Sequence, residues 1–241
     1  RFRGGRWPGR GRVVVWGAFA LALIVAPLVF RSSLALSMLT QMAYIVLICL
    51  SYNLLLGQGG MLSFGHAVYV GLGAYGTIHT LNLVSGGALP LPVSLLPLVG
   101  GLSGLFFAAL LGYVTTKKAA TPFAMITLGI GELVFAMSLM FPGFFGGEAG
   151  ISGNRVVGKP VWGISYGPQI QVYYLAALYC FLGTAALFAL TRTPLGRMLN
   201  AVRDNPERVE FVGYDTRIVR YIAFMIAGFF AGIGGGLMAI N

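Results

Sequence analysis

The sequence predicts an all-α protein, a polytopic bundle of membrane-spanning helices. Three observations lead to this prediction: 57% of the 241 residues are hydrophobic, only 9% are charged, and the charged residues gather between long apolar runs. A soluble domain of this size would lack the polar side chains to cover its surface, so the natural solvent is a bilayer. We expect one transmembrane domain over residues 13–241, preceded by a basic N-terminal segment over residues 1–12.

Seven apolar runs come close to the about 17 to 25 residues that a spanning helix needs. The predicted spans are residues 13–30, 34–56, 64–84, 91–116, 122–141, 170–191 and 221–241. The first run follows several arginines, as the core of a signal peptide would. Such a core has about 7 to 15 residues, so the greater length of this run favours a retained helix.

The distribution of Lys and Arg predicts the orientation. If the spans alternate and the N-terminus is cytoplasmic, the cytoplasmic segments hold 13 of the 16 basic residues, and only Arg31, Arg155 and Lys159 face outward. This bias agrees with the positive-inside rule. It makes 192–220 a cytoplasmic loop and 143–168 an external loop, whose glycines predict tight turns; a plain flexible connector is the alternative.

The loop 192–220 holds ten of the chain's 22 charged residues, so it must lie in water. An amphipathic helix is predicted over 195–204 from the apolar residues Leu195, Met198, Leu199 and Val202. Asn205 is expected to cap a second short helix with Pro206 at its first position, Glu207 in its first turn and Gly213 beyond its end. Such a rigid pair is suited to transmit force to a partner; a solvated surface pair is the alternative.

Residues 57–66 predict an interruption between two helices. Gly57, Gly59 and Gly60 disfavour a continuous helix, and Ser63 and His66 bring polar atoms to membrane depth. Irregular backbone at that depth persists where it is buried in protein or lines a water-filled path, so one interpretation is a translocation site. The other is a short cytoplasmic turn in which Ser63 caps the next helix.

Glu132 is the single acidic residue inside a predicted span. A charged carboxylate at that depth costs about 2.5 to 3.5 kcal/mol, so Glu132 should be protonated, paired or facing a cavity. We expect a hydrogen bond to a neighbouring helix that approaches at Gly129, with contact to substrate or a gate as the alternative. His66 and His79 are interpreted as hydrogen-bonded packing residues, and no metal site is predicted.

Several function classes find no support. Residues 71–76 spell a dinucleotide fingerprint inside an apolar span, and residues 153–159 spell most of a phosphate loop but continue into Pro160 instead of Ser or Thr. We predict no cofactor in this chain, so ATP and magnesium would bind partner subunits. The charged residues form separate groups between apolar spans and not a continuous basic face, which argues against binding of nucleic acid. The residues offer no nucleophile, base or metal cluster for an enzyme, and no paired intramembrane carboxylates for an ion-coupled transporter.

Four blocks of sequence, in order, resemble the LivM-type permease subunits of branched-chain amino-acid ABC importers, and the likeness runs from about residue 34 to the end. The blocks are LLLGQGGMLSFGHAVYVGLGAY, FAMITLGIGELVF, GGEAGISG and the stretch from Thr193 to Ala239. The resemblance implies inward transport of branched-chain or related hydrophobic amino acids by alternating access in a bacterial inner membrane. It also implies a second permease subunit, two cytoplasmic ATPase subunits and an external substrate-binding protein. A urea, amide or sugar permease of the wider family is the alternative.

The resemblance also implies roles for individual residues. The residues that it places in the element coupled to the ATPase are Arg203, Asn205, Pro206, Glu207, Glu210 and Gly213. The translocation path falls to Gly57, Gly59, Gly60, Ser63, His66 and, we expect, Glu132. Contact with the binding protein falls to Gly146, Gly147 and Glu148. Two features depart from the family: Glu148 stands where relatives tend to carry a small polar residue or Asp, and relatives usually continue with further membrane helices beyond residue 241, so the path is expected to be incomplete.

Overall fold

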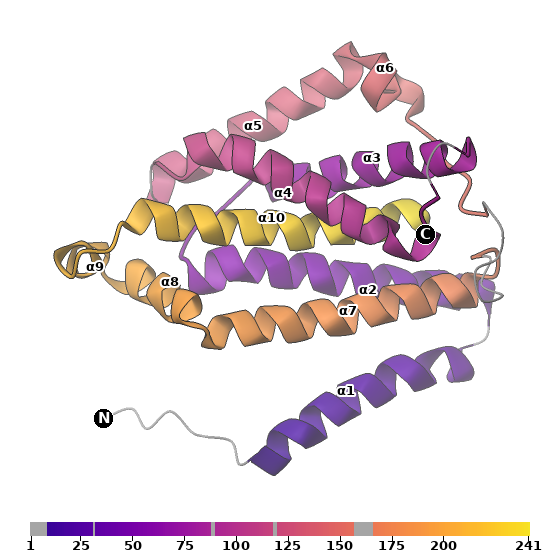
Figure 1. Ribbon diagram of the computed structural model, residues 1–241, viewed down its shortest axis with the longest axis horizontal. Helices are drawn as coiled ribbons and strands as arrows, with labels where there is room; N and C mark the ends of the chain where they lie inside the picture. The colour runs from indigo at the N-terminus through magenta and orange to yellow at the C-terminus, as the bar shows by residue number, and fades with distance from the viewer. Residues whose placement is uncertain (1–8, 31, 88–89, 118–119, 157–165) are drawn as a thin grey trace.

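The computed structural model describes residues 9–30, 32–87, 90–117, 120–156 and 166–241, and it confirms the predicted all-α bundle (Figure 1). No strand occurs among these residues. The long helices are α1 (Gly9–Val29), α2 (Ser33–Asn53), α3 (His66–Ser85), α4 (Leu96–Thr115), α5 (Ala120–Met140), α7 (Gln169–Arg192) and α10 (Thr216–Ile240). The short ones are η1 (Leu54–Gln58), η2 (Val93–Leu95), α6 (Pro142–Phe145), η3 (Gly147–Ala149), α8 (Pro194–Asp204) and α9 (Pro206–Phe211).

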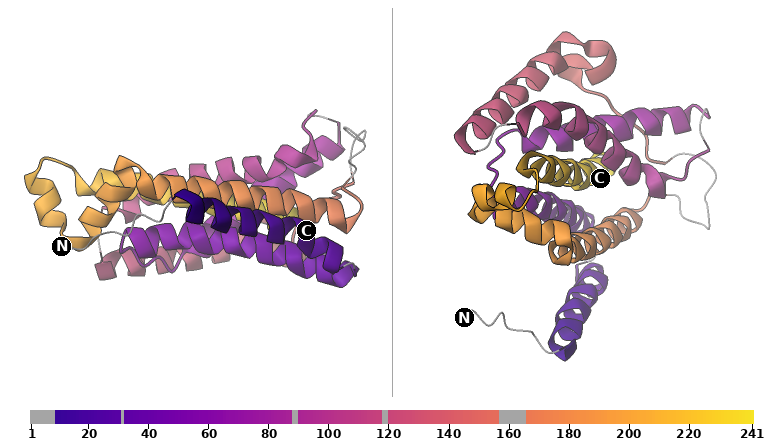
Figure 2. Two further views of the ribbon diagram at one scale, coloured as in Figure 1. Left: turned by 90° about the horizontal axis from the view of Figure 1, so that it is seen from below. Right: turned by 60° about the vertical axis from the view of Figure 1, so that its left-hand side comes forward.

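The long helices run up and down in alternation, which gives the bundle two ends (Figures 1 and 2). One end carries the start of α1, the helix pair α8–α9, and the connection from α2 to α3. The opposite end carries α6 and the end of α10. This grouping of segments is the one that the predicted topology requires, whichever end faces the cytoplasm.

Five of these helices are long and apolar enough to cross a membrane: Ser33–Gln58, Val93–Thr115, Thr121–Met140, Gln169–Arg192 and Thr216–Ile240, of the residues that the structure describes. The apolar part of α1, Val13–Val29, is shorter. α3 does not reach the same hydropathy because it carries polar side chains such as His79 and Asn82. Seven spans therefore stay a prediction, while the five helices make this a multi-pass membrane protein.

Helix α10 forms the centre of the bundle, where it packs against α4, α3 and α2. The apolar stretch of α10 is 61% buried, whereas that of α5, which lies at the margin of the bundle, is 17% buried (Figure 1). Glycines make the close packing possible: a Cβ atom at Gly232 would lie 2.4 Å from the Gly100 carbonyl oxygen, and one at Gly104 would lie 2.4 Å from that of Gly228. Small residues at a helix contact let membrane helices approach backbone to backbone.

The break between α2 and α3 is confirmed. Helix α2 ends in the π-helical turn η1, and α3 begins only at His66. Between them the chain has no regular structure, with Gly59, Met61 and Ser63 buried and the residues between them exposed. The alternative in which Ser63 caps α3 is wrong: Gly65 holds the capping position, without a side-chain bond, and the buried Ser63 hydroxyl makes no hydrogen bond.

The predicted helix pair is confirmed as α8 and α9, with the expected cap. The Asn205 side chain accepts a hydrogen bond from the Arg208 N–H at 3.1 Å, and Pro206 opens α9. Gly213 follows with a φ of +95°, a conformation that favours glycine. Leu199, Val202 and Val209 anchor the pair in the main hydrophobic core.

At the opposite end the chain makes the predicted tight turns. Gly146, Gly147 and Gly150 all have positive φ angles, and they surround the short helix η3. The His79 ring is 2.8 Å from the Phe144 carbonyl oxygen, so His79 is the packing residue that the sequence predicted. Residues 157–165 of the predicted loop lie outside the described part of the chain, as do residues 1–8 of the basic segment and the basic residues Arg31, Lys118 and Lys159.

Candidate functional site

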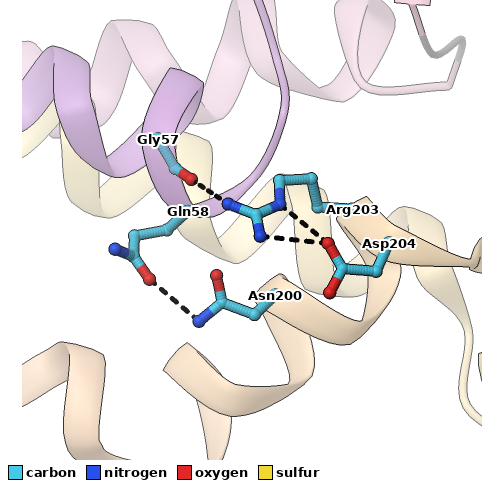
Figure 3. A network of polar contacts seen from close by, with 5 residues as sticks. All are labelled: Gly57, Gln58, Asn200, Arg203 and Asp204. Atoms are coloured by element: carbon cyan, nitrogen blue, oxygen red, sulfur yellow. Dashed lines mark hydrogen bonds and ion pairs between the residues drawn. The ribbon is translucent and has the colours of Figure 1, made fainter. Parts of the chain in front are cut away.

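The helix pair and the break, which the sequence predicts as separate elements, touch each other (Figure 3). The Arg203 guanidinium on α8 donates a hydrogen bond to the Gly57 carbonyl oxygen. One turn earlier, the Asn200 side-chain amide donates to the Gln58 side-chain oxygen at 2.9 Å. These bonds join residues 146 and 142 positions apart, and no local sequence signal predicts them.

The Gly57 carbonyl is available because the π-helical turn ends the helix. The Met61 N–H, which a continuous α-helix would direct to Gly57, bonds the Leu55 carbonyl oxygen at 2.9 Å instead. A carbonyl freed at a helix C-terminus carries partial negative charge, and a basic side chain satisfies it well. Asp204 holds the guanidinium in place from the other side, with its carboxylate 3.0 Å from both Nε and Nη2 of Arg203.

Two glycines of the break permit this close approach. Gly60 has a φ of +63°, and a Cβ atom there would lie 2.6 Å from Cγ of Arg203. A Cβ atom at Gly59 would lie 2.8 Å from the Leu55 carbonyl oxygen and 3.3 Å from the buried Leu199 side chain. A side chain at Gly60 would meet Arg203 of α8 and would also need a strained backbone, whereas a side chain at Gly59 would clash first with the Leu55 carbonyl oxygen of its own turn.

The polar side chains of the break lie deeper, between packed helices. The His66 Nε2 atom is 2.9 Å from the Ser51 hydroxyl of α2, and the Phe64 N–H donates to the Thr127 hydroxyl of α5 at 3.1 Å. Ser63 and His66 are 3% and 6% exposed, and among the described residues the Ser63 hydroxyl and the His66 Nδ1 atom have no hydrogen-bond partner. Of the residues that the structure describes, no three His, Cys, Asp or Glu side chains gather as metal ligands would.

The residues predicted to couple to a partner divide into two groups. Arg203, Asn205 and Glu210 are engaged within the chain; the Glu210 carboxylate accepts a hydrogen bond from the Thr216 hydroxyl at 2.8 Å and so ties α9 to α10. Pro206 and Glu207 are exposed on α9. The structure adds Phe211 and Val212, which are 90% and 74% exposed beside Gly213. The sequence signal for these two residues is a pair of large apolar side chains at the end of a charged helix.

Glu132 lies on the exposed side of α5. Across the described ranges, no hydrogen bond or ion pair involves its carboxylate, and nothing lies within 4 Å of a Cβ atom built at Gly129. The hydrogen bond expected between Glu132 and a neighbouring helix is therefore not made within the described part of this chain. Thr127, five residues earlier on the same helix, does reach the break.

At the other end of the bundle, Arg155 ties the connecting segment to α10. Its guanidinium donates to the carbonyl oxygens of Ile240 and Asn241 at 3.1 and 2.8 Å, and to the Gln169 side chain at 2.9 Å. Arg155 therefore holds the connecting segment against the last described residues of α10. Glu148, on η3, is exposed.

Comparisons with known proteins find relatives among transport permeases. The family model described as "Branched-chain amino acid transport system / permease component" matches residues 34–241. The chain is 30% identical over 255 residues to the high-affinity branched-chain amino acid transport system permease protein LivM of Escherichia coli, covering 95% of this chain and 58% of that protein. LivM of Salmonella typhimurium is 29% identical with the same coverage.

A third relative is named for a different substrate. The guanosine ABC transporter permease protein NupQ of Bacillus subtilis is 27% identical over 150 residues, covering 58% of this chain and 45% of that protein. No solved structure matches. The chain spans less than two thirds of the length of these relatives. Since the family model matches most of the chain, the protein belongs to the family of permease components of branched-chain amino acid transport systems.

Proposed function

We propose that this chain is a membrane subunit of an ATP-driven importer that moves branched-chain or related hydrophobic amino acids into the cell by alternating access. The observation that carries the proposal is the contact between α8 and the break: a charged helix pair at one end of the bundle holds an irregular segment of a membrane helix. A permease driven by ATP needs such a connection between the surface that contacts the ATPase and the segment that lines the translocation path. The chain itself performs no bond chemistry.

The motor in this proposal is a pair of cytoplasmic ATPase subunits that bind ATP and magnesium. They contact the exposed part of α9 at Pro206 and Glu207, together with the apolar residues Phe211 and Val212. A surface of exposed apolar side chains beside charges is what a protein interface uses. Asn205, Glu210 and Gly213 act less directly, because they fix the shape of α9 and its junction with α10.

The opposite end of the bundle faces outward in this proposal. An external substrate-binding protein docks near Gly146, Gly147 and the exposed Glu148. The protein resides in a bacterial inner membrane with its N-terminus in the cytoplasm, which puts the segments richer in Lys and Arg inside.

We further propose that the exposed side of α5 with Glu132 faces the second permease subunit, where the two chains enclose the path along Gly57, Gly59, Gly60, Ser63 and His66. A carboxylate facing lipid would be costly, so we propose that water of the path between the two chains reaches Glu132. In a variant with Cys49 and Cys180 replaced, Glu132→Cys should react with a water-soluble maleimide in the assembled transporter. The apolar residue Leu182, exposed on α7, supplies the control Leu182→Cys. Equal, slow labelling of both would place Glu132 against lipid and contradict this proposal.

The substrate class rests on the names of the relatives. Two are branched-chain amino acid permeases, and their alignments cover 95% of this chain, whereas the guanosine permease aligns over 58%. The latter makes a nucleoside a second candidate beside urea, amides and sugars. Excess leucine, isoleucine or valine should compete for uptake by the complex, whereas guanosine should not. The reverse pattern would replace the amino acid by a nucleoside.

Docking is tested by charge reversal at the exposed carboxylate of α9. Glu207→Arg should lower co-purification of the ATPase subunits with this chain while leaving the amount of folded chain unchanged. Glu148→Arg, an equal charge change at an exposed site on the opposite end, is the matched control and should retain the ATPases. Co-purification of Glu207→Arg at full yield, with full ATP-driven uptake, would rule out the docking surface.

A further inference from the structure

We infer that Arg203 and Asn200 form a latch that carries the movement of the helix pair to the broken end of α2. The inference rests on the proposed function, and it changes the role of Arg203. The resemblance assigned Arg203 to contact with the ATPase. Its guanidinium instead caps the freed Gly57 carbonyl and pairs with Asp204 (Figure 3). Arg203 is thus a positioning residue between the motor contact and the path.

The bonding of Arg203 supports this assignment. All three of its nitrogens have partners within the chain: Nη1 donates to the Gly57 carbonyl oxygen, and Nε and Nη2 meet the Asp204 carboxylate. Three of its five N–H groups are used in this way, so the guanidinium is directed toward the break even though the side chain is 41% exposed. Arg197, on the same helix, has a single bond at 3.5 Å to the Arg192 carbonyl oxygen, so it supplies a matched comparison.

The latch holds a part of α2 with weak internal bonding. The π-helical turn widens the helix at Leu54–Gln58, and the Leu55 carbonyl oxygen accepts from both the Gly59 and the Met61 N–H groups. The chain beyond it forms no helix until His66. Backbone of this kind can reorient without breaking a regular ladder of hydrogen bonds, and π-helical turns occur frequently at functional sites.

The contact is also close-packed, as a mechanical connection must be. The Cβ atom that a side chain would place at Gly60 lies 2.6 Å from Cγ of Arg203, so no gap separates the two segments. Leu199 of α8, 1% exposed, fills the space against Gly59. A displacement of α8 must therefore move the segment Gly57–Gly60 with it. The two segments are expected to move as one body through the transport cycle.

The first test separates the latch from docking. Arg203→Ala should leave co-purification of the ATPase subunits unchanged, and ATP hydrolysis should continue. ATP-driven uptake should fall about tenfold or more, because the lost hydrogen bond to a charged group no longer stabilises the contact between α8 and the break. Arg203→Lys, which keeps a cation at Gly57, should retain most of the uptake, and Arg197→Ala should retain all of it.

Two results would overturn the inference. Uptake unchanged in Arg203→Ala would mean that the contact transmits nothing. Loss of ATPase co-purification in Arg203→Ala would return Arg203 to the docking surface. A failure of the proposed function differs from both, because the unaltered chain would then neither bind ATPases nor support ATP-driven uptake.

The second test replaces the latch by a covalent bond. A Cβ atom at Gly60 would lie 3.6 Å from Cβ of Arg203, within the range of about 3.5 to 4.5 Å that disulfides span. With Cys49 and Cys180 replaced, the double variant Gly60→Cys/Arg203→Cys should form a disulfide on oxidation. Uptake lost through the absence of Arg203 should then recover, and reduction should remove it again. Gly60→Cys alone, which places a side chain at a φ of +63°, sets the uptake that can be recovered, and Arg203→Cys alone is the second control. A fully cross-linked protein whose uptake stays below that of Gly60→Cys would contradict the latch.

Discussion

At the scale of single residues, the helix pair depends on side chains that satisfy free backbone groups. Asn205 accepts from the Arg208 N–H at the start of α9, and Asp215 accepts from the Arg217 N–H at 2.8 Å at the start of α10. Arg203 serves the opposite kind of helix end, at Gly57. Each of these residues fixes where a helix starts or stops, and together they give the pair one shape.

The cap at Asn205 can be tested directly. Asn205→Ala removes the acceptor for the Arg208 N–H and should lower the local stability of α9 by about 1 kcal/mol, which corresponds to roughly fivefold faster amide exchange. Hydrogen–deuterium exchange of residues 206–211 in detergent measures this effect. Asn205→Ser keeps an acceptor and should stay close to the unaltered protein. Equal protection in Asn205→Ala would show that the cap does not hold α9.

Single residues were predictable where their role is local. Asn205, Pro206 and Gly213 follow short-range rules for helix ends, and the structure has them as predicted. The same rules made Ser63 a candidate cap for α3, and that alternative is wrong. Gly65 holds the capping position, and the buried Ser63 hydroxyl bonds no backbone group of α3. The bond from Arg203 to Gly57 could not be predicted, since it depends on how two distant segments pack.

At the scale of elements, the central feature is the glycine-lined contact of α10 with α4. Lipid provides no hydrophobic force between membrane helices, so close packing of small residues must supply the attraction. At Gly232 a side chain would meet the Gly100 carbonyl oxygen at 2.4 Å and the Gly104 Cα atom at 3.0 Å. Which helices meet through glycines depends on how distant segments pack, so this contact came only from the structure.

This packing predicts a difference between two glycines. Gly232→Val should force α10 and α4 apart and destabilise the protein by about 1 to 3 kcal/mol, as overpacked cores do. Gly71→Ala on α3, where nothing lies within 4 Å of the added Cβ atom, should be neutral or slightly stabilising. The apparent melting temperature of the detergent-solubilised protein compares them. A Gly232→Val protein as stable as Gly71→Ala would contradict the packing.

At the scale of the whole molecule, hydropathy predicted the helices because a bilayer requires long apolar segments, and the order of charged loops predicted which segments share an end. The structure has the start of α1 and the pair α8–α9 at one end and α6 at the other. Hydropathy alone did not find the contact between the pair and the break. That contact joins the predicted motor contact to the predicted path in one continuous structure.

The predicted orientation can be measured in intact cells with a membrane-impermeant thiol reagent. In the protein without Cys49 and Cys180, Glu148→Cys should be labelled from outside, because its loop is external. Glu207→Cys should be labelled only after the membrane is opened or in inside-out vesicles. Both side chains are exposed and lie in helical turns, so a difference in labelling would report the side of the membrane and not burial within the protein. The opposite pattern would invert the topology and place the helix pair outside.

The central claim is that this chain transports only when an ATPase acts on its α8–α9 pair. The most direct measurement is uptake of radiolabelled leucine into proteoliposomes that hold the chain with its second permease subunit and ATPases, with ATP on the side of α8–α9 and the binding protein on the other. The account predicts uptake that requires ATP, the ATPases and Glu207, and that fails in Glu207→Arg. Uptake by this chain alone under an ion gradient, or ATP-driven uptake undiminished in Glu207→Arg, would contradict it.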